Sequence, residues 1–233
     1  MLRRFVWILI LPAMLARISV ASIAQPQSHS PWTVESVLRE LDDESSNFES
    51  LTADIERTKV TVVVNVKSTE SGSIFVRGDK MRLDLKDPSP RTILRTGDTI
   101  FVYTPGLNRV EEYNLGKHRE LVDQFLLLGF GTSGHELKKG FLVTLLGERT
   151  LDQKKTLLLE LTPKSAGVRN QISKIHLWLD ESSWLPVQQE FFETGTEDYF
   201  TIHYANEVRN ANIPNSRFQP RWPKGVQRVK PEG

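Results

Sequence analysis

The sequence predicts a mainly β fold, in which a long and strongly curved antiparallel sheet is covered by a thin layer of helix. Three observations support this prediction. Apolar and polar residues alternate in short runs from Leu51 to about Val208, and turn-forming residues separate the runs. Only two segments show helical periodicity, and the first strand changes the parity of its apolar positions, which requires a bend. A curved sheet with so little helix encloses an apolar cavity, so we expect a carrier of a hydrophobic ligand.

The first 24 residues predict a signal peptide. Arg3 and Arg4 precede an apolar run from Phe5, and small residues follow at Ser22 and Ala24. The run is shorter than the about 20 residues that cross a bilayer. We therefore expect cleavage near Ala24, with a retained membrane anchor as the alternative. Residues 25–233 then form a single exported domain.

The composition narrows the possible partners. The chain contains no cysteine, so it cannot itself be acylated at one, and its stability depends on a packed core. Loss of the signal peptide removes three arginines and no acidic residue, which leaves 27 basic and 29 acidic residues. This balance gives no reason to expect nucleic acid as a partner.

The first helix is predicted to begin at Ser30 and Pro31, as an N-cap followed by proline at the first helical position. Its apolar residues recur at spacings of three and four, which is typical of an amphipathic helix lying across a sheet. They are Val34, Val37, Leu38, Leu41, Phe48 and Leu51.

The first strand is apolar at odd positions as far as Ile55 and at even positions from Val60 to Val66. A period of two cannot change parity without an extra residue, so we predict a bulge or a sharp bend near Glu56 to Lys59. The next strand, around Met81, has one polar face, whereas residues 74–76 and 100–103 are apolar on both faces. Turns are predicted at Ser71-Gly72, Gly78-Asp79, Gly97-Asp98, Pro105-Gly106 and Glu193-Thr194-Gly195.

A short second helix is predicted before Gly129 from the apolar residues Leu121, Val122, Phe125 and Leu126. Residues 129–140 contain four glycines and are predicted to be a mobile loop. Five more strands are expected at residues 141–149, 156–161, 172–179, 187–193 and 198–208.

No motif for catalysis, metal binding or cofactor binding is present, so the sequence predicts a protein that is not an enzyme. The histidines at 29, 118, 135, 176 and 203 show no metal-ligand spacing, and no nucleophile elbow or phosphate-binding glycine loop occurs. A hydrolase that depends on His176 or His203 is the enzymatic alternative.

Apolar side chains are more numerous than a simple sandwich core needs, with 11 phenylalanines and 5 tryptophans. Packing in the core is the alternative role for each of them singly. The candidates for lining a cavity are Phe75, Met81, Leu83, Phe101 and Tyr103 from strands and Val37, Leu41, Leu121 and Phe125 from helices.

Three segments in this order suggest a family. They are GSIFVRGDKMRL from Gly72, GDTIFVYTP from Gly97 with NRV from Asn108, and FQPRWPKGV from Phe218. After a signal peptide and one helix, they resemble the periplasmic outer-membrane lipoprotein carrier (LolA-like) family and its lipoprotein-sorting relatives. The likeness runs from about Thr33 to Val229.

This resemblance implies an unclosed antiparallel β-barrel (a half-barrel) covered by helices, whose concave face holds the acyl chains of a lipoprotein or another lipid. It further implies a monomer in the periplasm that accepts cargo from an inner-membrane ATP-driven exporter and delivers it to an outer-membrane acceptor. Members of the family often have an arginine just after the strand that matches Gly72 to Val76, where it holds the lid shut. Here Gly78 occupies that position, and Arg77, one residue earlier, is the candidate latch. The alternative function on this fold is a periplasmic lipid sensor that binds a protein partner.

Overall fold

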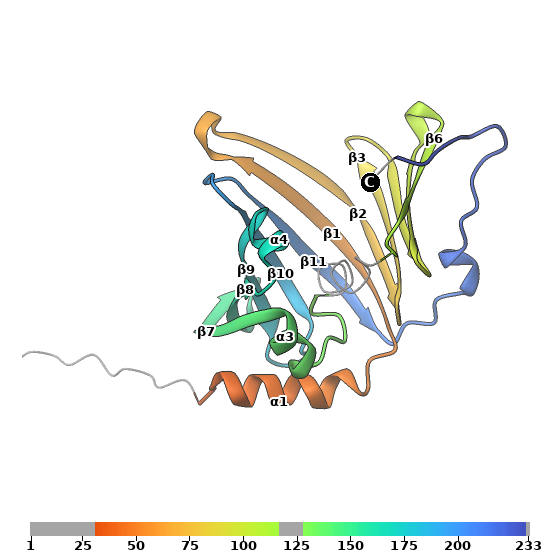
Figure 1. Cartoon of the computed structure of the whole chain (residues 1–233). Coiled ribbons are helices and arrows are strands. Elements are labelled where there is room, and N and C mark those ends of the chain that lie inside the picture. The colour runs from red at the N-terminus through yellow and green to blue at the C-terminus, as the bar shows by residue number, and fades with distance from the viewer. Residues whose placement is uncertain (1–30, 117–127, 232–233) are drawn as a thin grey trace, which may run out of the picture.

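A computed structural model describes residues 31–116 and 128–231 of the chain. These residues form one sheet of 12 strands in the order β12-β6-β5-β4-β3-β2-β1-β11-β10-β9-β8-β7. Neighbouring strands are antiparallel, except that β12 is parallel to β6. The end strands β12 and β7 do not pair with each other, so the curved sheet stays open (Figure 1). This architecture confirms the predicted half-barrel with a few helices.

One arm of the sheet comprises β1 (Ser50–Thr61), β2 (Val66–Arg77), β3 (Lys80–Asp87), β4 (Arg91–Thr96), β5 (Thr99–Thr104), β6 (Arg109–Asn114) and β12 (Gln227–Val229). The other arm comprises β7 (Phe141–Leu151), β8 (Lys154–Pro163), β9 (Ile172–Asp180), β10 (Pro186–Glu193) and β11 (Tyr199–Arg209). The helices within the described residues are α1 (Val34–Ser45), α3 (Gly134–Gly140) and α4 (Ala166–Arg169), with 3-10 turns η1 (Val62–Val64), η2 (Pro105–Leu107) and η4 (Asn215–Phe218). The five strands predicted after residue 140 are confirmed as β7 to β11.

Helix α1 begins and ends elsewhere than predicted. Its N-cap is Thr33, because the backbone N–H of Ser36 donates to the Thr33 hydroxyl at 3.1 Å and the Thr33 N–H donates to the Ser36 hydroxyl at 2.9 Å. The helix ends at Ser45, so Phe48 lies outside it and Leu51 lies in β1. The predicted stripe therefore combined a helix with the start of a strand.

Two contacts fix the end of α1 to the sheet. Arg209 from β11 forms an ion pair with Glu44 and donates to the Glu44 backbone oxygen at 2.7 Å, which places a cation at the C-terminus of the helix. The Asn210 side chain accepts from the Glu49 N–H at 2.9 Å and donates to the Asn47 backbone oxygen at 2.9 Å. The connection between α1 and β1 is therefore held at several points.

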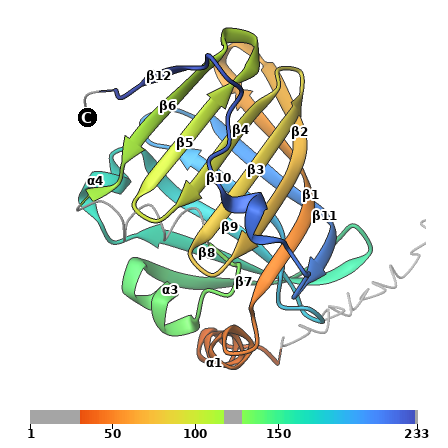
Figure 2. The ribbon, with the colours of Figure 1, turned by 90° about the vertical axis from the view of Figure 1, so that its right-hand side faces the viewer.

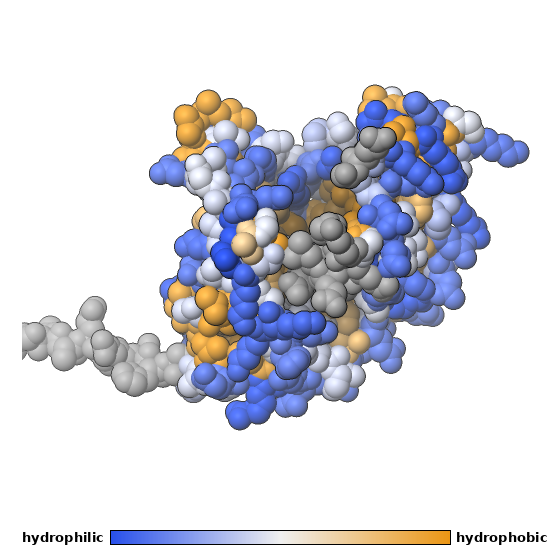
Figure 3. Space-filling view, viewed as in Figure 1, coloured by the Kyte–Doolittle hydropathy of each residue, from blue (hydrophilic) through white to orange (hydrophobic). Residues whose placement is uncertain are grey.

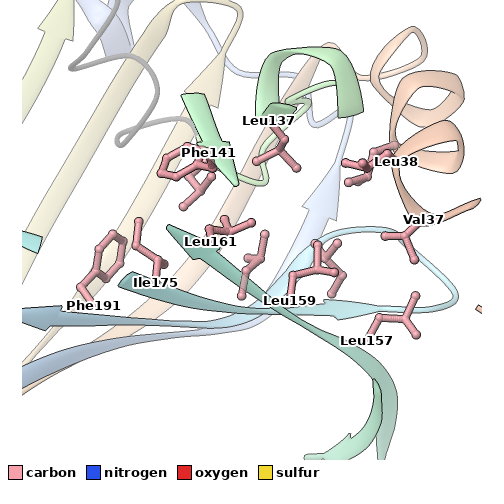
Figure 4. Packing of buried hydrophobic residues seen from close by; sticks show 13 residues of the cluster. Val37, Leu38, Leu137, Phe141, Leu157, Leu159, Leu161, Ile175 and Phe191 are labelled. Atoms are coloured by element: carbon pink, nitrogen blue, oxygen red, sulfur yellow. The ribbon is translucent and has the colours of Figure 1, made fainter. Parts of the chain in front are cut away.

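The larger core lies between the helices and the inner face of β7 to β10 (Figure 4). Val37 and Leu38 from α1 and Leu137 from α3 pack against rows of leucine from the strands. Gly134 permits this layer, because a Cβ at that position would collide with the backbone of Leu38. The fully buried strand residues in this core are Leu157, Leu159, Leu161, Ile175, Leu177 and Leu179.

Three further predictions are wrong. No bulge lies near Glu56 to Lys59, because the register of β1 is unbroken there against both β2 and β11; the irregularity lies instead between Thr52 and Asp54, opposite β11. The turn predicted at Ser71-Gly72 does not form, because both residues lie inside β2, where a Cβ on Gly72 would collide with the Asp84 backbone. The segment predicted as a mobile loop contains helix α3, whose N-terminus is closed by a capping box between Ser133 and Glu136.

Other predictions fall outside the described residues. These are the signal peptide at residues 1–24 and the second helix with Leu121, Val122, Phe125 and Leu126. Among residues 31–116 and 128–231, no helix is both long enough and apolar enough to span a membrane.

Candidate functional site

The short turns of the β2–β6 arm determine which residues share a face. Across the two-residue turn Gly78-Asp79, Val76 is paired with Met81 and Ile74 with Leu83. Pairing continues from Leu83 to Ile93 in β4 and from Ile93 to Val102 in β5. Paired residues lie on the same face of a sheet, so this row belongs to the face that continues into the core under α1. We call it the inner face.

The burial of the apolar side chains on the inner face decreases with distance from α1. Near α1 it is buried, because Phe130 and Leu185 pack with Val76 and Met81. Toward the opposite end its apolar residues are only half-buried. Figure 3 shows the molecule hollowed between the two arms, with apolar residues in its depth. The half-buried residues are Leu83, Ile93, Ile100, Val102, Phe200 and Ile202.

A buried chain of hydrogen bonds lies below this hollow. Tyr204 in β11 donates its hydroxyl to Gln189 Oε1 at 3.0 Å, and Gln189 Nε2 donates to the Leu128 backbone oxygen at 2.6 Å. The Phe130 ring meets the Tyr204 ring edge-on, with 5.1 Å between centroids. Burial raises the pKa of Tyr204 and keeps its hydroxyl protonated as a donor. The chain segment from residue 128 is thereby fixed against the sheet.

Charged residues border the apolar part of the inner face. Glu70 accepts from Arg57 Nη1 at 2.9 Å and from Arg91 Nη2 at 2.8 Å. The Arg57 guanidinium also lies over the Phe200 ring, 4.8 Å from its centroid. Two arginines share one carboxylate, so this cluster has one net positive charge beside apolar side chains.

The structure separates the predicted lining residues. Met81 and Leu83 lie on the inner face, and Val37 and Leu41 are buried in the core beneath α1. Phe75, Phe101 and Tyr103 have the opposite parity and lie on the outer face. Leu121 and Phe125 are outside the described residues. The set therefore does not come together around one cavity.

The C-terminal segment covers the outer face of β2 to β6, as Figure 2 shows. Trp222 packs against Phe101 and Tyr103 with centroid distances of 6.0 and 5.2 Å. Phe218 and Ile213 form a small buried cluster with Leu94, and Phe75 packs against it. These aromatic residues of β2 and β5 thus support a C-terminal strap, which we define as residues 211–222.

Arg77 also contacts the C-terminal strap. Its guanidinium donates to the Ile213 backbone oxygen at 2.6 Å and to the Asn215 side-chain oxygen, and it lies 5.1 Å from the centroid of the Phe218 ring. The residue predicted as a latch for the helical lid therefore binds a different segment on the opposite face.

Sequence reasoning missed the inner-face residues Ile93, Ile100, Val102, Phe200 and Ile202. The alternation within a single strand does not show which of its faces continues into the next strand, because this depends on the register through the turns. The candidate histidines lie on the outer face. His176 is 3.1 Å from Glu160 and 3.4 Å from Glu190, and within residues 31–116 and 128–231 no three His, Asp or Glu side chains are arranged to hold a metal ion.

The fold and the inner face define a class of protein, an open half-barrel whose concave face carries half-buried apolar side chains within residues 31–116 and 128–231. A family model described as "Uncharacterized protein" matches residues 86–213, more than half of the chain. The chain belongs to that family.

Further proteins are similar to this chain in sequence or in structure. An uncharacterized protein of Methanocaldococcus jannaschii is 23% identical over 193 residues, which is 83% of this chain. The chain spans about half, 52%, of that relative. An uncharacterized conserved protein of Thermus thermophilus has a solved structure with a TM-score of 0.57 at 11% identity, covering 85% of this chain and all of that one. A LolA superfamily protein of Nitrosomonas europaea is similar at 14% identity and a TM-score of 0.41, covering 81% of this chain and 98% of that one.

Proposed function

We propose that the inner face binds the acyl chain of a lipid or lipoprotein, and that the protein is a periplasmic carrier of such cargo rather than an enzyme. The observation that supports this most directly is the row of half-buried apolar residues Leu83, Ile93 and Val102 on the inner face. Side chains of this kind on a concave surface suit an apolar ligand.

The energetics favour a long apolar chain. Each buried methylene is worth about 0.8 kcal/mol, so one long acyl chain gives roughly 10 kcal/mol of gross transfer energy. A carrier must also release its cargo, and a wide apolar face with few directional contacts allows this. The Arg57–Glu70–Arg91 cluster would bind the lipid headgroup, because its net positive charge suits a phosphate or carboxylate.

Two adjacent residues on β5 provide a matched test. Val102→Asp places a carboxylate on the inner face, and we expect it to weaken binding of a fluorescent fatty acid by at least about tenfold. Phe101→Ala changes the outer face beneath Trp222 and should leave binding within about twofold. Equal loss in both variants, with both still folded by circular dichroism, would contradict an inner-face site.

The natural cargo can be identified by native mass spectrometry with lipid extraction on protein purified gently from its own cells. Co-purified acylated molecules support the carrier. A ligand-free mass, together with no uptake of the fluorescent fatty acid, would exclude lipid binding.

The headgroup assignment has its own test. Arg91→Gln should weaken binding of an anionic lipid more than that of a neutral lipid with the same chains. The acyl-chain site stands if only the anionic lipid is affected, and the headgroup site fails if both lose affinity equally.

A further inference from the structure

Two turns at the same end of the sheet expose apolar side chains to solvent. The β1–β2 turn presents Val63, Val64 and Val66, whose relative exposures are 87%, 62% and 53%. The β5–β6 turn presents Leu107, which is 61% exposed. Both turns lie at the end of the molecule opposite α1, on either side of the hollow (Figures 1 and 3). We call residues 62–66 the first tip and residues 105–108 the second tip.

The fold does not require apolar residues at these tips. Each tip is a 3-10 turn closed by an asparagine in the left-handed conformation, Asn65 with φ 49° and Asn108 with φ 45°. The Asn65 N–H donates to the Val62 backbone oxygen at 3.0 Å, and the Asn108 N–H donates to the Pro105 backbone oxygen at 2.9 Å. Neither 3-10 turn has a buried residue, and turns usually carry polar residues. The valines and the leucine therefore suit a contact outside the chain.

Lysines accompany the apolar side chains at both tips. Lys59 and the exposed Lys67 flank the first tip in the paired strands β1 and β2. At the second tip, the Asn108 side chain donates to the Gly225 backbone oxygen at 3.1 Å, which brings the exposed Lys224 next to this turn. Lys59 is paired with Glu193 at 2.9 Å, and the Asp198 carboxylate accepts from the Val62 N–H at 2.9 Å and keeps its charge, so the positive charge that the tips offer to a partner comes from the exposed Lys67 and Lys224.

We propose that the two tips insert into the surface of an anionic lipid bilayer. Apolar side chains on a protruding turn, with lysines a few residues behind them, match the layers of a bilayer, in which acyl chains lie beneath anionic headgroups. Insertion of both tips turns the open end of the hollow toward the membrane. This proposal goes beyond the carrier function, because it concerns docking and requires no bound cargo.

The first test measures cosedimentation with phosphatidylcholine vesicles that contain either no anionic lipid or about 30% phosphatidylglycerol. The double variant Val63→Asp/Val64→Asp should bind anionic vesicles at least about tenfold more weakly than the parent protein. Leu142→Asp is the matched control, because Leu142 is 62% exposed but lies in the far edge strand β7. All proteins carry the same N-terminus, so their differences report only the substituted residues.

Binding should also weaken when salt is added, because the lysines contribute through screened charge. Equal binding by the parent and the tip variant, or an equal loss in the Leu142 control, would overturn the proposal. So would the absence of binding to both kinds of vesicle, which would leave a protein receptor as the partner of the tips.

The second test locates the contact. The chain has no cysteine, so Val63→Cys, Leu107→Cys and Leu142→Cys each provide a single site for an environment-sensitive dye. On anionic vesicles the emission should rise and shift to the blue for labels at 63 and 107 and stay unchanged at 142. A label at 63 that remains in water while the protein cosediments would show that another surface binds the membrane, and the proposal would fail.

Discussion

The first arm of the sheet, which we define as β7 to β10, and the second arm, β2 to β6, differ in how their two faces are covered. In the first arm the inner face packs against α1 and α3, and its leucines in β8 and β9 are fully buried. In β2 to β6 the outer face is covered by the C-terminal strap, whereas Leu83, Ile93 and Val102 on the inner face remain half-buried. The first arm thus supplies stability. In the second arm the inner face is buried only near α1, beside Phe130 and Leu185, and the C-terminal strap packs on the outer face.

The largest expected effect tests this division of roles. Leu159→Ala removes a fully buried side chain from the first arm and should lower the free energy of unfolding by about 3 kcal/mol. Ile93→Ala removes a half-buried side chain from the second arm and should cost about 1 kcal/mol. Urea denaturation of both variants measures the difference. Equal losses would mean that both inner faces serve as core.

A second comparison concerns two glycines that lie against the backbone of another element, one in helix α3 over the first arm and one in strand β2 of the second arm. Gly134→Ala should push α3 away from Leu38, and Gly72→Ala should push β2 away from Asp84. Each overpacking should cost about 1–3 kcal/mol in thermal unfolding. Gly106→Ala is the control, because nothing lies within 4 Å of a Cβ at that position. A loss in the control as large as in the two variants would refute the steric explanation.

Much of this arrangement could be predicted from the sequence. The turns Gly78-Asp79 and Gly97-Asp98 each contain two residues, so they fix the register of the strands on either side. Followed through these turns, parity places Phe75 opposite Arg82 rather than beside Met81. The capping box of α3 was likewise visible as Ser133 three residues before Glu136.

The C-terminal strap could not be predicted in the same way. Its only regular element before β12 is the four-residue 3-10 turn η4, and it has no apolar periodicity of its own. Its place depends on contacts from distant strands, such as Arg77 with Ile213 and Tyr103 with Trp222. Such contacts belong to the folded chain and have no local pattern.

The strap provides a third prediction. Arg77→Gln removes the guanidinium from Ile213 and Phe218 and should lower stability by about 1–2 kcal/mol. Trypsin should then cleave faster after Arg217 or Arg221, as mass spectrometry of the fragments would show. Lys67→Gln, in the exposed part of the same strand, is the control. Unchanged cleavage in Arg77→Gln would show that the aromatic contacts alone hold the strap.

The smallest expected effect concerns Glu160 on the outer face of the first arm, where charged side chains contact one another. Hydrogen bonds from Lys174 and then His176 lower the pKa of Glu160 below its ordinary value of 4.5, against the opposing effect of burial. A carboxyl whose pKa is lower in the folded state adds stability that is present above the unfolded pKa and is lost as the pH falls through the folded pKa. Glu160→Gln should therefore cost at most about 1 kcal/mol at neutral pH.

This cost should disappear on acidification below the folded pKa of Glu160, as urea denaturation over a pH series would show. The exposed Glu197, in the turn between β10 and β11, provides the control Glu197→Gln. A cost that stays constant across the series would assign the role of Glu160 to packing rather than to charge. The outer face of the first arm would then resemble that of the second, where contact with neighbouring side chains provides the stability.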